Sequence, residues 1–88
     1  MVITWDEAKR LANIDKHGVD FAESTLGFFE TSLVIPARSP RYKAVGRMND
    51  RILVVVFAPL GTEAVSIVSV RAASKAERKL FDERQASL

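Results

Sequence analysis

The spacing of apolar residues changes near Leu33. Before this point apolar positions recur every three or four residues, and after it they alternate or form unbroken runs. The first pattern is typical of helices that bury one face, and the second of β-strands. We therefore predict an α+β domain with two N-terminal helices, an antiparallel sheet of three to four strands, and a C-terminal helix.

Three helix starts are marked by a capping side chain followed three residues later by Glu, so that each side chain can accept from the backbone N–H of the other residue. The pairs are Thr4 with Glu7, Asp20 with Glu23, and Ser74 with Glu77. We expect the first helix to end at Gly18, because glycine readily adopts positive φ. Its predicted buried stripe is Trp5, Ala8, Leu11 and Ala12.

The strand region begins with a short apolar run, 33–35, that ends at Pro36. An alternating strand, 41–48, is predicted to turn at Asn49-Asp50 into a second strand, 51–58, and residues 63–71 form a third. The run 52–57 is apolar on both faces, which indicates a central, covered strand. We expect the helices to cover one side of this meander and to leave the other partly open.

Composition narrows the class of protein. Eighty-eight residues, 48% apolar and 27% charged, are typical of one soluble globular domain. The chain has no Cys and a single His, which excludes disulfides and argues against a metal site. The longest apolar run, 52–60, is far shorter than the roughly 20 residues of a membrane span, and the first residues lack a secretion signal. We predict a cytoplasmic protein with no cofactor, no metal and no membrane contact.

Charge divides the chain unevenly. Residues 1–32 hold three Lys or Arg against six Asp or Glu, whereas residues 33–88 hold ten against five. Arg41, Lys43 and Arg47 have the period-two spacing that aligns side chains on one face of a strand. A basic strand face suits a polyanion such as RNA, so we expect these three cations on the open side of the sheet.

The segments that carry a resemblance are spread along the whole chain. They are Trp5-Asp6, Asn13, Lys16-His17-Gly18-Val19, Phe21, Arg41 with Gly46, Arg51, Ile67-Val68-Ser69-Val70-Arg71-Ala72 and Glu77-Arg78. In this pattern the chain resembles the BrnT family of toxins from type II toxin–antitoxin systems. The Lys-His-Gly-Val segment and the Ser-x-Arg-Ala segment followed by Glu-Arg are its most specific parts.

The resemblance implies a single BrnT-like toxin domain, 1–88, with a RelE-like ribonuclease fold. It implies a metal-independent endoribonuclease that stops translation. The implied partner is a ribbon-helix-helix, BrnA-like antitoxin that forms a hetero-oligomer with the toxin, neutralises it and represses the shared operon, so that DNA is contacted only through the antitoxin.

The chain departs from the family pattern at three places. Pro40 stands where an acid usually precedes the strand arginine, Ser66 replaces an arginine, and Thr31-Ser32 replaces Asp-Pro. The departures at Pro40 and Ser66 favour a second hypothesis, a catalytically degenerate toxin that survives as an antitoxin-binding module. The sequence pI near 9.3 suggests a third, a sequence-nonspecific nucleic-acid binder, although the net charge is only +2.

Cleaving RNA without a metal requires a base, an acid and cations that stabilise the charge on the reacting phosphate. Arginine suits the last task because its planar group binds phosphate oxygens in pairs. We expect the arginines to converge in one cleft, with catalytic candidates His17, Arg41, Arg51 and Arg71 and RNA-binding candidates Lys16, Lys43 and Arg47.

Each candidate also has an ordinary structural explanation. His17 is the single imidazole of the chain and the default candidate for a proton shuttle, yet it equally suits capping of the first helix. Strand-end arginines can simply be solvated charges, and the basic stripe could bind an acidic antitoxin segment instead of RNA. Trp5 and Tyr42 could stack on bases but are expected to pack in the core, and Glu77 is expected to act as the capping partner of Ser74.

Overall fold

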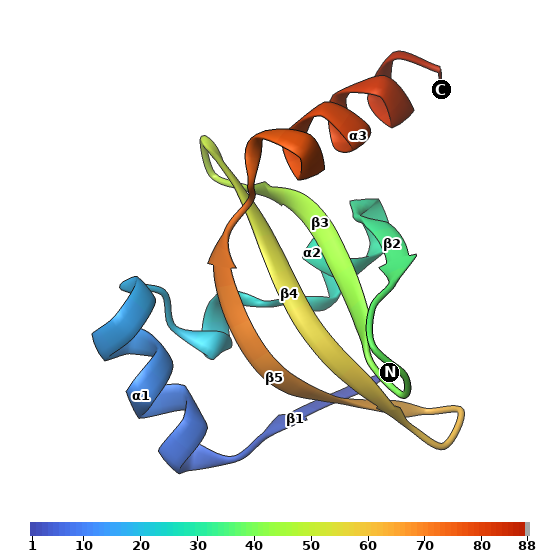
Figure 1. Cartoon of the computed structure of the whole chain (residues 1–88). Coiled ribbons are helices and arrows are strands. Elements are labelled where there is room, and N and C mark those ends of the chain that lie inside the picture. Colours follow the sequence, from blue (N-terminus) through green and yellow to red (C-terminus); the bar gives the residue numbers. More distant parts are fainter. Residues whose placement is uncertain (88) are drawn as a thin grey trace.

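The protein folds into a five-stranded mixed sheet with helices on both faces, as a computed structural model describes for residues 1–87 (Figure 1). The elements in chain order are β1 (Val2–Trp5), α1 (Glu7–His17), the 3-10 helix η1 (Phe21–Glu23), α2 (Leu26–Thr31), β2 (Leu33–Pro36), β3 (Tyr42–Met48), β4 (Arg51–Leu60), β5 (Ala64–Ala72) and α3 (Lys75–Ala86). The strand order is β1-β5-β4-β3-β2. None of the helices within residues 1–87 has the length and apolar character needed to cross a bilayer.

The prediction of an antiparallel sheet preceded by two helices is wrong at the N-terminus. Residues 2–5 form β1, which pairs in parallel with β5 in the register Val2↔Ala64 to Trp5↔Ile67. Thr4 therefore belongs to a strand, where its hydroxyl donates to the Val65 carbonyl. The first helix is capped instead by Asp6, whose carboxylate accepts from the Lys9 N–H. The partner strand lies about sixty residues away, so no local pattern could indicate this pairing.

The other two capping boxes are present, and one of them caps an unexpected element. Ser74 and Glu77 begin α3 as predicted. Asp20 and Glu23 also form a capping box, but it encloses only the single 3-10 turn η1. A separate helix, α2, then begins with the Thr25 side chain as its cap.

The hairpin between β3 and β4 turns where the sequence predicts. Asn49 has φ 57°, a left-handed conformation that asparagine tolerates better than most residues. β4 continues past its predicted end and includes Pro59. Since β3 begins at Tyr42, opposite Phe57, the last residues of β4 pair only with β5, and the missing N–H of proline is tolerated there.

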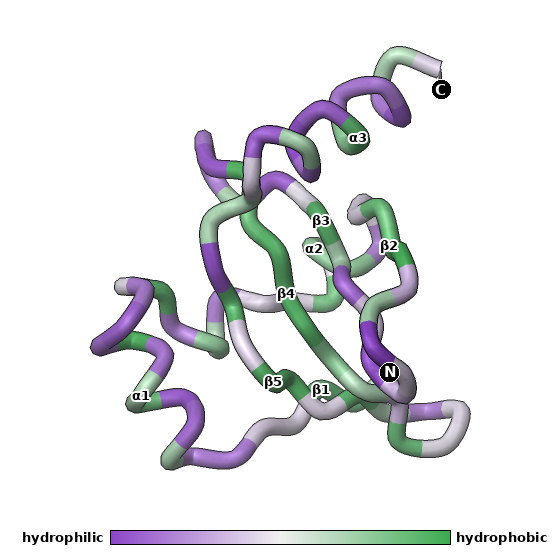
Figure 2. Tube along the Cα trace, in the orientation of Figure 1, coloured by the Kyte–Doolittle hydropathy of each residue, from purple (hydrophilic) through white to green (hydrophobic). Residues whose placement is uncertain are grey.

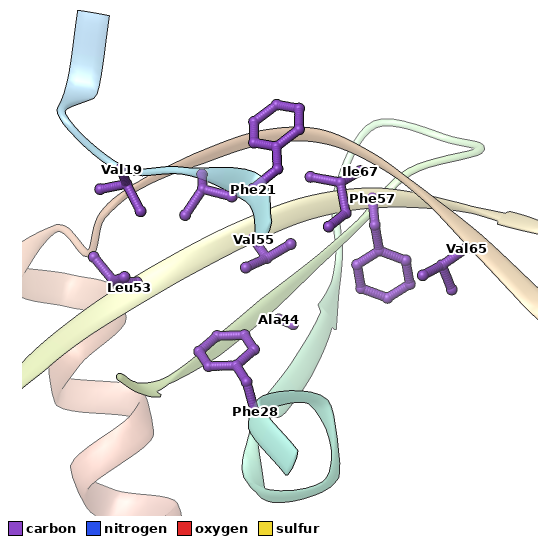
Figure 3. Packing of buried hydrophobic residues seen from close by; sticks show 10 residues of the cluster. Val19, Phe21, Phe28, Ala44, Leu53, Val55, Phe57, Val65 and Ile67 are labelled. Carbon is purple, nitrogen blue, oxygen red and sulfur yellow. The ribbon is translucent and has the colours of Figure 1, made fainter. Parts of the chain in front are cut away.

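Helices cover both faces of the sheet, which corrects the prediction that they lie on one side. β4 is hydrophobic along most of its length (Figure 2), and alternate residues enter two cores. Leu53, Val55 and Phe57 belong to the larger core under η1 and α2 (Figure 3). On the opposite face Val45 and Val54 pack against Phe81 of α3. α3 covers only one end of that face and projects beyond it (Figure 1).

The predicted buried stripe of α1 is also wrong. Leu11 is 55% exposed, Ala8 and Ala12 are exposed, and the buried residue of the helix is Asn13. The reason is that α1 lies along the β5 side of the sheet instead of across a core face (Figure 1). Trp5, predicted to pack in the core, does so from β1, with its ring edge-on to Phe21 at 6.4 Å.

Gly46 lies against Phe28 of α2 with no space for a side chain. A Cβ atom there would lie 2.8 Å from Cε2 of Phe28 and 3.2 Å from Cβ of Ser32. We expect Gly46→Ala to lower the free energy of unfolding by about 1–3 kcal/mol, because the buried ring must move. Gly27→Ala is the matched control, since its nearest neighbour would be 3.8 Å away. Urea denaturation measures the free energy of unfolding of both variants. Equal values for Gly46→Ala and Gly27→Ala would contradict the close approach.

A candidate RNA-binding groove between α1 and the sheet

A groove of about 310 Å³ lies between α1 and β5. Its lining residues are Lys9, Ala12, Asn13, Lys16, His17, Arg41, Val68 and Ser69. The five helical members are spaced three, one, three and one residues apart, so they form a single face of α1. The groove therefore lies between one face of α1 and strand β5, and Arg41, which precedes β3, is its remaining lining residue.

Asn13 attaches α1 to that strand. Its Nδ2 donates to the carbonyl oxygens of Val19 at 2.9 Å and Val70 at 2.8 Å, and the Val70 N–H donates to its Oδ1 at 3.0 Å. β1 ends opposite Ile67, so beyond this residue the side of β5 away from β4 has no neighbouring strand within residues 1–87. The buried carboxamide takes the place of that strand, because it satisfies both backbone groups of Val70. Sequence reasoning assigned no role to this residue.

A β-bulge shapes the strand side of the groove. Val56 pairs with Ser69 and Phe57 with Ile67, so Val68 has no partner on β4. Such an insertion bends a strand and redirects its side chains. Val68 and Ser69 both line the groove at this bend.

The structure brings three of the predicted candidates together here. Lys16 and His17 come from the last turn of α1, and Arg41 comes from the residue that precedes β3. Gly18, at φ 71°, donates its N–H to the Ile14 carbonyl and caps the helix. The backbone of Gly18 thus performs the capping for which His17 was the alternative candidate.

Lys9 is a third Lys or Arg side chain in the groove lining, beside Lys16 and Arg41, and sequence reasoning missed it. It lies seven residues before Lys16, which is two helical turns and the same face, so the signal was available once that face was known. No carboxylate is among the groove's lining residues. Elsewhere too, within residues 1–87, no three His, Cys, Asp or Glu side chains gather as metal ligands would.

Arg71 and Lys43 lie on the α3-covered face and are held by Glu77. Nη1 and Nη2 of Arg71 donate to the two Glu77 carboxylate oxygens at 2.7 and 2.9 Å, and Lys43 Nζ donates to Oε2 at 3.0 Å. The Glu77 side chain is only 8% exposed. The hydrogen bonds from Arg71, with those from Ser74 and Lys43, hold the pKa of Glu77 far below its usual value although burial opposes this. The pKa of Arg71 is raised in return.

Glu77 therefore does more than the capping role predicted for it. Its Oε1 accepts from the Ser74 N–H at 2.8 Å, as the capping box requires. The same carboxylate joins β3, β5 and α3 through Lys43 and Arg71.

The expected convergence of Arg41, Arg51 and Arg71 is wrong. Arg41 precedes β3, whereas Arg51 pairs with Met48 at the far end of that strand. Arg51 lies two residues before Leu53 and therefore shares its sheet face. Arg71 pairs with Val54, so it lies on the other face. Arg71 is occupied by its carboxylate, which leaves Arg41 as the arginine of the groove.

Arg47 and Tyr42 also differ from their predicted places. Arg47 lines a separate hollow beside α2, with Glu23, Thr25 and Thr31 among its neighbours. Only Arg41 of the three-residue basic stripe therefore lines the groove. Tyr42, expected to be packed, stacks on Phe57 with ring centroids 5.9 Å apart, yet it stays 38% exposed.

Removing the Glu77 charge is expected to destabilise the protein in a pH-dependent way. Glu77→Gln keeps a capping-box side chain but leaves Arg71 and Lys43 without their carboxylate. Both cations are partly exposed, so we expect a loss of about 2 kcal/mol of unfolding free energy at about pH 7. Because the folded-state pKa of Glu77 is lowered, its contribution is present above the ordinary value of 4.5 and is lost as pH falls below it.

Urea denaturation of both proteins between about pH 7 and about pH 3 measures this difference. The stabilities of the wild type and of Glu77→Gln should approach each other in acid. A gap that stays constant across this range would show that the charge of Glu77 contributes no stability.

The comparisons agree with the sequence pattern. The family model described as the ribonuclease toxin BrnT of a type II toxin–antitoxin system matches residues 5–77. The crystal structure of the Brucella abortus ribonuclease toxin BrnT is 46% identical in sequence, with a TM-score of 0.80, and the match covers 85% of this chain and 99% of that chain. Comparison with curated proteins gives no match. The chain therefore belongs to the BrnT family of ribonuclease toxins of type II toxin–antitoxin systems.

Proposed function

We propose that this protein is a metal-independent endoribonuclease that binds single-stranded RNA in the groove between α1 and β5. The observation that carries the proposal is the charge of that groove. Lys9, Lys16, His17 and Arg41 line it and no carboxylate does. Exposed cations without an internal partner are available to bind phosphate, because they need not first be released from an ion pair.

The reaction needs two proton transfers around one phosphate. The 2′-oxygen attacks phosphorus as a base takes its proton, and the bond to the 5′-oxygen breaks as an acid supplies one, which leaves a 2′,3′-cyclic phosphate and a 5′-hydroxyl. His17 is the candidate for proton transfer, since imidazole exchanges protons near neutral pH. Arg41 and Lys16 stabilise the negative charge that grows on the phosphate oxygens.

The cluster of Lys43, Arg71 and Glu77 supports binding from a neighbouring position. Lys43 pairs with Val56, and Val56 pairs with Ser69 of the groove lining, so the cluster lies close to the groove. Two cations share one carboxylate, which leaves one net positive charge beside the groove. In this proposal the cluster attracts RNA through its field, while Arg41 makes the direct contact.

RNA affinity of the groove variants tests where the phosphate binds. Lys16→Ala and Arg41→Ala should each weaken binding of a short single-stranded RNA and reduce the slope of log affinity against log salt by about 0.7, the value for one lost phosphate contact. The matched control is Arg84→Ala, which removes an exposed cation in the last turn of α3. Fluorescence anisotropy over a salt series measures the slopes. Equal slopes in all three variants would rule out the groove.

A second candidate function is an antitoxin-binding module without catalytic activity. The observation that favours it is the bidentate pair of Arg71 with Glu77, because an arginine of the family pattern is thereby occupied. Pro40 and Ser66, which replace an acidic residue and an arginine of that pattern, favour it as well. Under either function we propose a ribbon-helix-helix antitoxin as the partner, with DNA contacted only through that protein.

Expression in bacteria without a partner separates the two functions. The nuclease predicts growth arrest, cleaved transcripts and a fall in translation, with recovery when the antitoxin encoded beside it is co-expressed. His17→Ala should restore growth, and cleavage by the purified protein should persist in EDTA because no metal takes part. Normal growth together with tight antitoxin binding would instead support the module.

A further inference from the structure

A second, smaller hollow lies beside the groove, in the connection between β2 and β3. It has a volume of about 130 Å³ and is lined by Pro36, Ala37, Ser39, Pro40, Arg41 and Tyr42. We call it the loop crevice. Arg41 lines both the loop crevice and the groove, so the two hollows share this residue.

Tyr42 gives the loop crevice a fixed aromatic wall. Its ring stacks on Phe57 at 5.9 Å with an interplanar angle of 26°, and Phe57 contacts Phe29 edge-on at 5.4 Å. The ring of Tyr42 is therefore held from within the core. Because 38% of the residue remains exposed, it also presents aromatic surface to a ligand.

The loop itself is held in shape by its backbone. The Ala37 N–H donates to the Arg41 carbonyl at 3.1 Å, and the Arg41 N–H donates to the Arg38 carbonyl at 2.9 Å. Two prolines supply apolar walls, and Ser39 and Tyr42 supply hydroxyl groups. The crevice thus offers flat apolar contact together with a few hydrogen-bonding groups, which is the combination that recognises a nucleobase.

The size of the crevice limits its occupant. Its volume is slightly below the about 150 Å³ of a cavity that binds benzene, so it accommodates about one planar ring but no helix or duplex. An occupant tethered to a phosphate at Arg41 would be a single base that has left its stack. RNA in single strands provides such bases without the energy needed to open a duplex.

We propose that the loop crevice is a nucleobase subsite: it binds the base of the nucleotide adjacent to the phosphate held by Arg41, with Tyr42 as the stacking platform. The inference rests on the proposed function, because the groove must hold that phosphate. Its consequence is a base preference at one position next to the cleaved bond. The protein then reads sequence through the crevice and binds the backbone through the groove.

The test compares intact and abasic RNA. The probes are short single-stranded oligonucleotides with a 2′-deoxy sugar at the cleavage position, which prevents reaction, and with the base removed from one flanking nucleotide at a time. Wild-type protein should bind the intact probe about 10-fold more tightly than the abasic probe at one flanking position. Tyr42→Leu should lose this difference and still bind the abasic probe as the wild type does.

Two further variants separate stacking from folding. Tyr42→Phe keeps the aromatic ring and should retain the preference for the intact probe. Ala37→Leu fills the crevice without altering the stack of Tyr42 on Phe57, and it should remove the preference as Tyr42→Leu does. Thermal denaturation confirms that each variant is folded. An unchanged preference in Ala37→Leu would overturn the proposal even if Tyr42→Leu proved unstable.

Lys16→Ala distinguishes failure of the subsite from failure of the groove. If the groove holds phosphate, this variant weakens binding of intact and abasic probes equally. Loss of affinity for both probes in Lys16→Ala, with no base preference in wild type, would leave the nuclease function standing and overturn the subsite. If Tyr42→Leu weakened antitoxin binding alone, the crevice would be a protein contact and the subsite would be wrong.

Discussion

The groove depends on one buried side chain, Asn13, which makes the backbone hydrogen bonds that a neighbouring strand would otherwise make. The Asn13 carboxamide satisfies both backbone groups of Val70 where, within residues 1–87, β5 has a neighbouring strand on one side only, and it holds the Val19 carbonyl as well. An unsatisfied backbone group at this edge would be costly, so the contact sets both the depth and the rotation of α1. Lys16 and His17 follow at helical spacing and are therefore turned toward the sheet with Asn13.

Lys and Arg residues that look alike in the sequence differ in the structure by whether a carboxylate lies beside them. Arg71 and Lys43 donate hydrogen bonds to Glu77. These charge-assisted bonds are strong because the carboxylate is buried. Lys9, Lys16 and Arg41 line a groove with no carboxylate among its lining residues. The first set stabilises the position of α3, and the second set is available to a phosphate.

The aromatic residues beneath the β2–β3 connection both fill the larger core and support an exposed ring. Phe57 packs in the larger core and also supports the ring of Tyr42 at the surface. Phe29 contacts Phe57 edge-on from α2, so the same helix that closes the core also steadies the exposed ring. A ring held by packing from inside loses little freedom when a ligand binds, which the proposed subsite would use.

The sequence by itself determined the family, the capping boxes at Asp20 and Ser74, the glycine cap of α1 and the strands from Leu33 onward. These features follow from side chains that act on their own backbone within a few residues, or from an alternation that a single strand imposes. Only the tertiary structure decided that β1 pairs with β5, that Asn13 is buried, and that Arg41 joins Lys16 and His17 while Arg51 and Arg71 do not. Each of these depends on contacts between residues far apart in the chain, whose register and partners are set by packing of the whole domain and leave no local pattern.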